Sequence, residues 1–165
     1  MQLVWMPMQG FQQGAQPITS YNYGAKKLDR VKKTFKALFI TCLGFSLAVV
    51  ITIELFPGMF LAIFTNNTEL IEIGKTPLRI FIAGMSVMGA QGACQQTFLA
   101  LGEAKISVFL ACLRKIILLF PLALILPTVA SLGVWGLFLA EPISDFLASG
   151  VTTIMFKIRS KKILQ

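Results

Sequence analysis

The chain alternates between long apolar stretches and short polar segments. Four stretches are each close to the roughly 20 residues that a helix needs to cross a bilayer core of about 30 Å. They are Ala37 to Phe56, Leu78 to Leu101, Ile106 to Val129 and Val134 to Phe156. Apolar and polar residues do not alternate within them, as they would in the strands of a membrane barrel. The pattern predicts an all-α, polytopic membrane helix bundle with four full transmembrane helices.

The residues before these stretches are more polar. Residues 1–12, MQLVWMPMQGFQ, are too short to span a bilayer and predict the end of a partial N-terminal helix. They lack the basic start of a signal peptide, so none is expected. The segment from Gln13 to Lys33, QGAQPITSYNYGAKKLDRVKK, is rich in turn residues. We expect Gly14, Pro17 and Gly24 to end that helix and form a turn, with the tyrosines at the membrane interface.

Composition supports the membrane class. Hydrophobic residues make up 56% of the chain and charged residues 13%, with a mean hydropathy of +0.77. Soluble domains are about half apolar and about a quarter charged. The net charge of +8 does not indicate nucleic acid, because Lys and Arg lie in short blocks between the apolar stretches. We therefore expect lipid, and no nucleic acid, as a partner.

The basic residues predict an orientation. They fall in three segments, which are the region before the first full span (Lys26, Lys27, Arg30, Lys32, Lys33 and Lys36), the loop before the third span (Lys105) and the tail (Lys157, Arg159, Lys161 and Lys162). Two predicted spans separate each of these segments from the next, so all three lie on the same side of the membrane. The other side has Lys75 and Arg79 beside Glu69 and Glu72, and an uncharged link from Ala130 to Gly133. By the positive-inside rule, the first loop and the C-terminus of a multi-pass plasma-membrane protein should be cytoplasmic.

Close helix packing is expected where small residues recur within the spans. These residues are Gly84, Gly89, Gly92, Gly136, Ala140, Ala148 and Gly150. Pro121, Pro127 and Pro142 lie inside spans and predict kinks, because each removes a backbone donor. Glu54 and Arg79 lie near the outer ends of their spans, where we expect them to pair or to reach the interface.

Three strings carry a family resemblance. They are QGAQPITSYNYGAKKLDRVKK, PLRIFIAGMSVMGAQGACQQTFLALGEAKIS and SLGVWGLFLAEPISDFLASG. In this order they resemble the C-terminal lobe of multidrug and toxic compound extrusion (MATE) transporters. The resemblance covers residues 1–165 and corresponds to the tail of helix 8 and helices 9 to 12 of a family built from two six-helix lobes.

The resemblance implies multidrug efflux by antiport. It implies cationic amphipathic drugs as substrates, sodium ions or protons as the coupling ion, and no cofactor. The N-terminal lobe and helix 7 lie outside the chain, and a separate chain is one possible source of that lobe. Two other functions stay open. One is a lipid-linked precursor flippase of the same superfamily, which would have a strongly cationic central cavity. The other is a small structural membrane protein with no transport activity alone.

Catalysis and metal binding have little support. Cys42, Cys94 and Cys112 lie in separate spans without CxxC spacing, and histidine is absent. No hydroxyl nucleophile has an evident base partner along the sequence. We expect neither an enzyme nor a metal site.

The charged residues inside the spans are the first candidates for a site, because a charge in the bilayer is costly unless it is paired or hydrated. Glu141 and Asp145 are four residues apart and share one helix face. At about 1.5 Å per residue, Asp145 lies roughly 16 Å deep, and Arg114 and Lys115 lie roughly 12 to 14 Å deep on the neighbouring helix. An ion pair across the two helices is therefore possible. It could act as a proton or cation relay or as a static pair, and we favour the static pair.

Uncharged amides form the second group of candidates. Gln91 and Gln95 are also four residues apart, with Gln96 adjacent, at overlapping depth. They could line a substrate cavity or bond between helices. Some family members carry an acidic cation-binding residue in this span, but none lies between Leu78 and Leu101 here. The predicted substrate or cation pathway consists of Gln91, Gln95, Glu141, Asp145, Arg114 and Lys115.

Overall fold

The computed structural model describes residues 2–128 and 133–163, and every regular element in these ranges is helical. The elements are α1 (Gln2–Gly24), α2 (Leu28–Leu55), α3 (Pro57–Ala62), α4 (Thr68–Ala83), α5 (Met85–Ala100), α6 (Ala104–Cys112), the π-helical segment η1 (Leu113–Leu119), α7 (Phe120–Thr128) and α8 (Val134–Ile163). The all-α prediction is confirmed. The predicted end of the third span at Val129 and most of the link from Ala130 to Gly133 lie outside the described residues.

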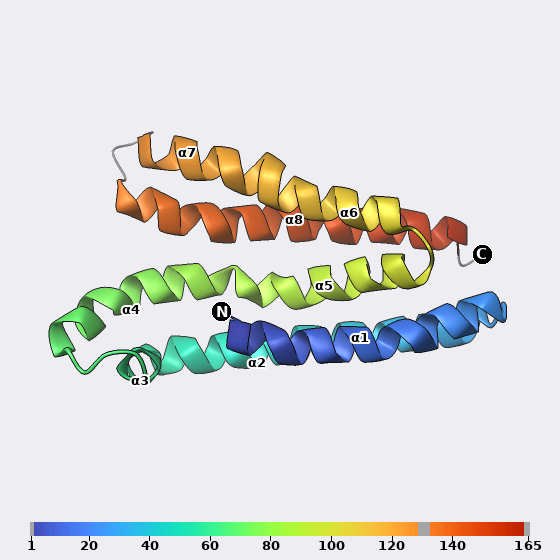
Figure 1. Ribbon diagram of the computed structural model, residues 1–165, viewed down its shortest axis with the longest axis horizontal. Coiled ribbons are helices and arrows are strands. Elements are labelled where there is room, and N and C mark those ends of the chain that lie inside the picture. The colour runs from blue at the N-terminus through green and yellow to red at the C-terminus, as the bar shows by residue number, and fades with distance from the viewer. Residues whose placement is uncertain (1, 129–132, 164–165) are drawn as a thin grey trace.

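The helices form three layers (Figure 1). Helices α1 and α2 form an antiparallel hairpin on one side, α4 and α5 follow one another through the middle, and α6, η1 and α7 lie with α8 on the other side. Helix α5 contacts α1, α2 and α8. It is therefore the central helix of the bundle.

The sequence of α5 explains its central place. Small residues recur along it, and every residue from Met88 to Cys94 is buried, as expected for a helix packed on all sides. A Cβ added to Gly89 would lie 2.7 Å from the carbonyl carbon of Cys42 and 2.7 Å from Oγ of Ser46. Ser46 Oγ in turn donates a hydrogen bond to the carbonyl of Ser86, at 3.2 Å. Glycine thus lets α5 lie directly against the backbone of α2.

Most of the predicted packing residues lie at such contacts. An added Cβ would meet the backbone of a neighbouring helix at Gly84 and Gly136 as well, whereas at Gly92 it would meet only the side-chain amide of Gln12. Ala140 and Ala148 are fully buried. The prediction was wrong for Gly150, which is exposed and has no neighbour within 4 Å of an added Cβ. Gly150 lies on the outward face of α8, where a small residue brings no helix closer.

Helix α1 is longer than the sequence predicted. It continues through Gly14 and Pro17 to Gly24, so only Ala25, Lys26 and Lys27 separate it from α2. Burial of one face of α1 against α2 and α5 explains why Gly14 and Pro17 do not end the helix, since tertiary packing supplies most helical stability in proteins. Gly24 is the last residue of α1, as predicted. Interhelical bonds add to it, as Ser20 Oγ donates to the carbonyl of Ala100 at 2.9 Å.

The four predicted spans correspond to α2, to α4 with α5, to α6 through α7, and to α8. Within the described residues, three continuous helical stretches are long and apolar enough to cross a membrane, namely Leu28–Leu55, Ala104–Thr128 and Trp135–Lys161. The second predicted span is divided at Gly84, which leaves two helices of 16 residues. The third contains the π-helical segment η1, which ends two residues before Pro121. The proline ring and its missing N–H favour such a widened turn.

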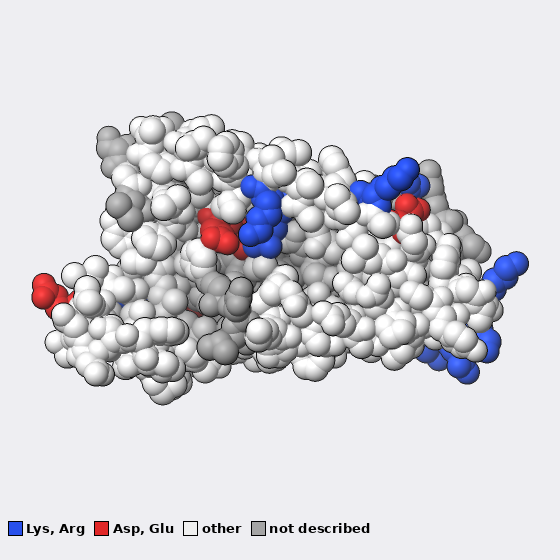
Figure 2. All heavy atoms as spheres, viewed as in Figure 1, with Lys and Arg blue, Asp and Glu red and all other residues white. Residues whose placement is uncertain are grey.

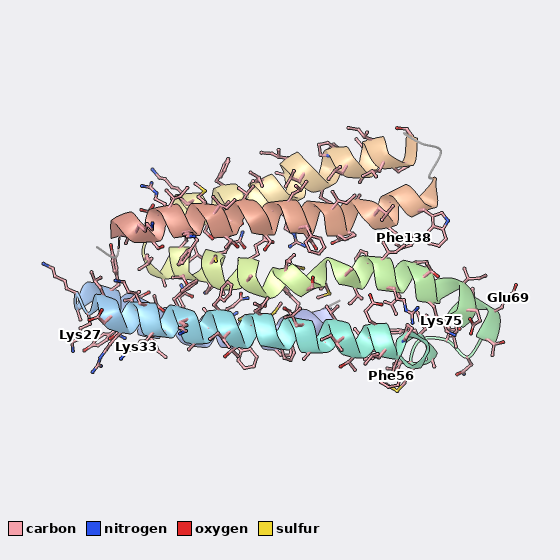
Figure 3. The ribbon with its side chains drawn as sticks, turned by 180° about the vertical axis from the view of Figure 1, so that it is seen from behind. Lys27, Lys33, Phe56, Glu69, Lys75 and Phe138 are labelled. Carbon is pink, nitrogen blue, oxygen red and sulfur yellow. The ribbon has the colours of Figure 1, made fainter. Side chains whose placement is uncertain are left out.

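The three basic segments lie at one end of the bundle. This end holds the α1–α2 turn, the start of α6 and the end of α8 (Figure 1). Val31 and Leu101 are buried together there, with Leu28 and Ile163 packed against them. Lys27 and Lys33 stand at this end, and Glu69 and Lys75 at the opposite end (Figure 3). The prediction that the basic segments share one side is confirmed.

The predicted pairing of Glu54 with Arg79 is also confirmed. Arg79 Nε lies 3.5 Å from Glu54 Oε2, and Arg79 Nη2 donates to the backbone carbonyl of Glu54 at 3.2 Å. Both side chains are partly exposed. The pair joins α2 to α4 at the end of the bundle opposite the basic segments.

Candidate functional site

Arg114 and Asp145 form an ion pair between η1 and α8. The Nε atom of Arg114 donates to Oδ1 of Asp145 at 2.6 Å, and the Asp145 side chain is 3% exposed. The predicted ion pair across these helices is therefore present, with Arg114 and not Lys115 as the partner. Arg114 Nη2 also lies 3.6 Å from Sδ of Met88 on α5.

The surrounding backbone holds this pair in place. Ser144 Oγ donates to the carbonyl of Arg114 at 3.1 Å, which joins α8 to η1 a second time. On the other side, a Cβ added to Gly84 would lie 2.7 Å from Cα of Pro142 and 3.0 Å from Oδ2 of Asp145. The division between α4 and α5 thus lies against α8 beside the carboxylate.

A cavity of about 230 Å³ opens at the ion pair. Its lining combines four charged residues with an apolar wall: Arg114, Lys115, Glu141, Asp145, Trp5, Phe81, Met85 and Met88. Acidic and basic groups lie side by side near the middle of this face of the molecule (Figure 2). Among the described residues, neither Glu141 nor Lys115 forms an ion pair. The cavity therefore offers one carboxylate and one ammonium group to a ligand.

A second hollow of about 90 Å³ adjoins the first. It shares Trp5, Met88, Arg114 and Lys115 with the larger cavity and adds Gln91, Gly92, Gln95 and Ala111. Oε1 of Gln91 and Nε2 of Gln95 are buried and have no hydrogen-bond partner within the described part of the chain. An unsatisfied buried amide is costly, so both groups are suited to hold water or a polar ligand.

The third glutamine has a different place. Gln96 Nε2 donates to Oε1 of Gln16 on α1 at 2.7 Å. It therefore joins α5 to α1 and does not line either cavity. The six predicted pathway residues, in contrast, all line one or both of these adjoining spaces.

Two further residues were missed by the sequence analysis. Trp5 lines both cavities, and Gln12 is 7% exposed with its Nε2 buried, without a partner among the described residues, against Gly92. The spacing of Met8, Gln12, Thr19 and Asn22 along α1, all buried, follows one helix face and could have revealed Gln12. That face was overlooked because the helix was expected to end earlier.

A protein-family model described as MatE matches residues 1–125 of the chain. Among solved structures, the chain is similar to the MATE multidrug transporter DinF-BH, solved with a bound ligand, with 35% sequence identity and a TM-score of 0.90. That match covers 99% of this chain and 36% of the other. A comparison with curated proteins found no match.

More distant structures share the fold. One is a multidrug resistance MATE family transporter of the MOP superfamily in an inward-facing conformation, with 19% identity, a TM-score of 0.87, and coverage of 98% of this chain and 38% of the other. Another is MATE in complex with MaL6, with 19% identity, a TM-score of 0.90, and coverage of 98% and 37%. The chain thus spans little more than a third of the length of the solved structures it matches.

Proposed function

Because the chain belongs to the MatE family, we propose that residues 1–165 form part of the C-terminal lobe of a multidrug antiporter. The transport unit expels cationic amphipathic drugs in exchange for sodium ions or protons. Its other helices correspond to the remaining length of the solved relatives and come from the same polypeptide or from a separate chain. In two-lobe transporters the substrate site lies between the lobes near the middle of the membrane, and one lobe rocks against the other.

The observation that carries this proposal is the charged cavity about midway along the bundle, away from the charged residues at its two ends. Ionisable residues inside a membrane are expensive, and they commonly mark substrate and ion pathways. Two cations and two carboxylates line the cavity, which suits an antiporter better than a flippase for anionic lipid-linked precursors. Such a flippase would need a predominantly cationic site.

We assign the residues different roles. Glu141 attracts the cationic part of a substrate or the coupling ion, because its carboxylate has no ion-pair partner among the described residues. Arg114 and Asp145 form a static pair that holds η1 against α8. Gln91 and Gln95 supply hydrogen bonds to the substrate or to its water.

The proposed location is the plasma membrane, with the basic end of the bundle in the cytoplasm. The support is the gathering of the basic segments at one end, together with the positive-inside rule. A reporter enzyme that is active only in the cytoplasm, fused after Gln165, should be active. An inactive fusion, together with activity of a reporter that works only outside the cytoplasm, would contradict this orientation.

The transport test uses ethidium, a fluorescent dye that is both cationic and aromatic and so represents the proposed substrate class. The full chain is reconstituted in liposomes under an imposed sodium or proton gradient, alone and together with the helices that complete a MATE transporter. We expect gradient-driven dye movement only in the completed unit, and the effective gradient identifies the coupling ion. Glu141→Gln should abolish it, whereas Glu103→Gln, a change of the same kind at the start of α6, should not. If the dye does not move in any folded preparation, alone or completed, the alternative of a structural membrane protein without transport activity remains.

A further inference from the structure

A separate basic hollow lies at the α1–α2 turn, away from the two adjoining cavities described above. It measures about 610 Å³ and is lined by Lys26, Lys27, Leu28, Asp29, Arg30, Lys32 and Lys33. Five cations therefore face a single carboxylate, and within the described residues Asp29 forms no ion pair. All five cationic residues are exposed. The hollow can accept an anion.

The turn that carries these cations is well defined. The N–H of Lys26 donates to the carbonyl of Tyr23, and the N–H of Lys27 to that of Asn22, both at 2.9 Å. These two bonds form a Schellman motif, whose left-handed position is usually a glycine. Here that position is Lys26, with φ of +57°. A charged side chain thus occupies a place where glycine would be less strained, and such backbone strain is typical of functional positions.

An apolar surface continues from the hollow along α2. This stripe starts beside the hollow at Lys33 and continues through Ala37, Ile40, Gly44, Leu47 and Ile51. Its members are three or four residues apart, so they lie on one helix face. All six are exposed, and a Cβ added to Gly44 would meet nothing within 4 Å. The cationic group and the apolar stripe together match a molecule with an anionic head and a long hydrocarbon tail.

We propose that this hollow binds the headgroup phosphate of an anionic phospholipid, with an acyl chain lying along the α2 stripe. Clusters of Lys and Arg beside a membrane helix attract anionic lipids, and the attraction falls off within a Debye length of about 8 Å at physiological salt. A free phosphate ion would use the cations but not the stripe. The inference does not depend on transport.

The test is native mass spectrometry of the purified full chain in detergent, titrated with phosphatidylglycerol or phosphatidylcholine. The variant Lys26→Gln/Arg30→Gln/Lys33→Gln removes three cations of the hollow. The matched control, Lys105→Gln/Lys157→Gln/Arg159→Gln, removes three cations from the same end of the bundle but outside the hollow. Circular dichroism verifies that each variant is helical, and Lys26→Arg/Lys33→Arg supplies a charge-conserving version.

We expect the wild type to retain phosphatidylglycerol and the hollow variant to bind it at least about tenfold more weakly. The control and the charge-conserving variant should stay within about threefold of the wild type, and phosphatidylcholine should not compete. Equal losses in the hollow variant and the control would overturn the proposal, because the charge of the whole end would then suffice. Displacement of the lipid by an equal concentration of inorganic phosphate would also overturn it, because the stripe would then contribute nothing.

Discussion

The guanidinium of Arg114 and the carboxylate of Asp145 meet at 2.6 Å between η1 and α8, and both side chains are largely shielded from solvent. Removing one partner of such a pair leaves the other charge buried and uncompensated, which costs far more than the pair itself contributes. The two residues are therefore best tested together.

Arg114→Met should destabilise the chain by about 3 kcal/mol, because Asp145 loses its partner inside the bundle. Lys115→Met, at the neighbouring exposed position, should change stability by less than about 0.5 kcal/mol. Detergent-induced unfolding followed by circular dichroism measures both. The exchange Arg114→Asp/Asp145→Arg should recover part of the loss. If the exchange restores folding but not transport by the completed unit, the static role that we assign to the pair is wrong.

Gly89→Ala should destabilise the α2–α5 contact by about 2 kcal/mol, because the new methyl group meets the backbone of Cys42. Gly44→Ala is the matched control on α2. Its methyl group meets nothing within 4 Å, and alanine is favoured over glycine in a helix by roughly 0.5 to 1 kcal/mol. Thermal unfolding of the purified variants should move in opposite directions. Equal behaviour would show that the close approach at Gly89 is not rigid.

The sequence was informative about α2, α6 through α7 and α8, because a membrane span depends on length and hydropathy, which are properties of a local segment. The boundary of α1 could not be obtained in this way. Gly14 and Pro17 are turn residues by local preference, yet the helix continues because α2 and α5 cover one of its faces. Residues distant in the sequence thus allow α1 to continue past Gly14 and Pro17.

The candidate site, too, could be predicted from the sequence only in part. Arg114 and Asp145 were correctly predicted to lie close together, since both depths follow from the helical rise. Which of Arg114 and Lys115 pairs with Asp145 could not be predicted, because it depends on the π-helical turn and on Ser144. Trp5 was missed, because only the packing of α1 against α5, which the sequence pattern does not give, brings it to the cavity.

The bond between Gln16 and Gln96 provides a direct measure of α1–α5 association. Gln16→Leu and Gln96→Leu, alone and together, form a double-mutant cycle. We expect a coupling free energy of about 0.6 to 2 kcal/mol, the range found for hydrogen bonds between membrane helices. Unfolding in increasing denaturing detergent gives the four stabilities. A coupling indistinguishable from zero would mean that the bond does not contribute to holding α1 in place.

Gln91→Leu should leave stability unchanged or raise it slightly. The amide oxygen of Gln91 is buried without a partner in the described residues, so its replacement removes a desolvation cost and no bond. Transport by the completed unit should nevertheless fall, because the small hollow loses its acceptor. Measuring unfolding and ethidium movement on the same preparations separates the two effects. A large loss of stability would indicate that an ordered water already satisfies Gln91.

Lys26→Gly should stabilise the α1–α2 turn by about 1 kcal/mol, because glycine adopts the left-handed conformation without strain. The same change at Lys27, whose φ is −87°, offers no such relief and serves as the control. Thermal unfolding gives the stabilities, and retention of phosphatidylglycerol should fall in the Lys26 variant. A stabilised variant with undiminished lipid retention would show that the lysine is not kept for lipid binding.

Three neighbouring helices have irregular backbones at one level of the bundle. Gly84 separates α4 from α5, it lies against Pro142 of α8, and Ser144 of α8 bonds to Arg114 in η1. Each irregularity removes or lengthens hydrogen bonds that would otherwise resist bending. These helices are therefore less stiff in bending at the depth of the buried charges, whereas α2, which contacts both α4 and α5, is one continuous helix. Bending of the bundle at this depth is therefore resisted by α2 and by the Arg114–Asp145 pair, which links η1 to α8.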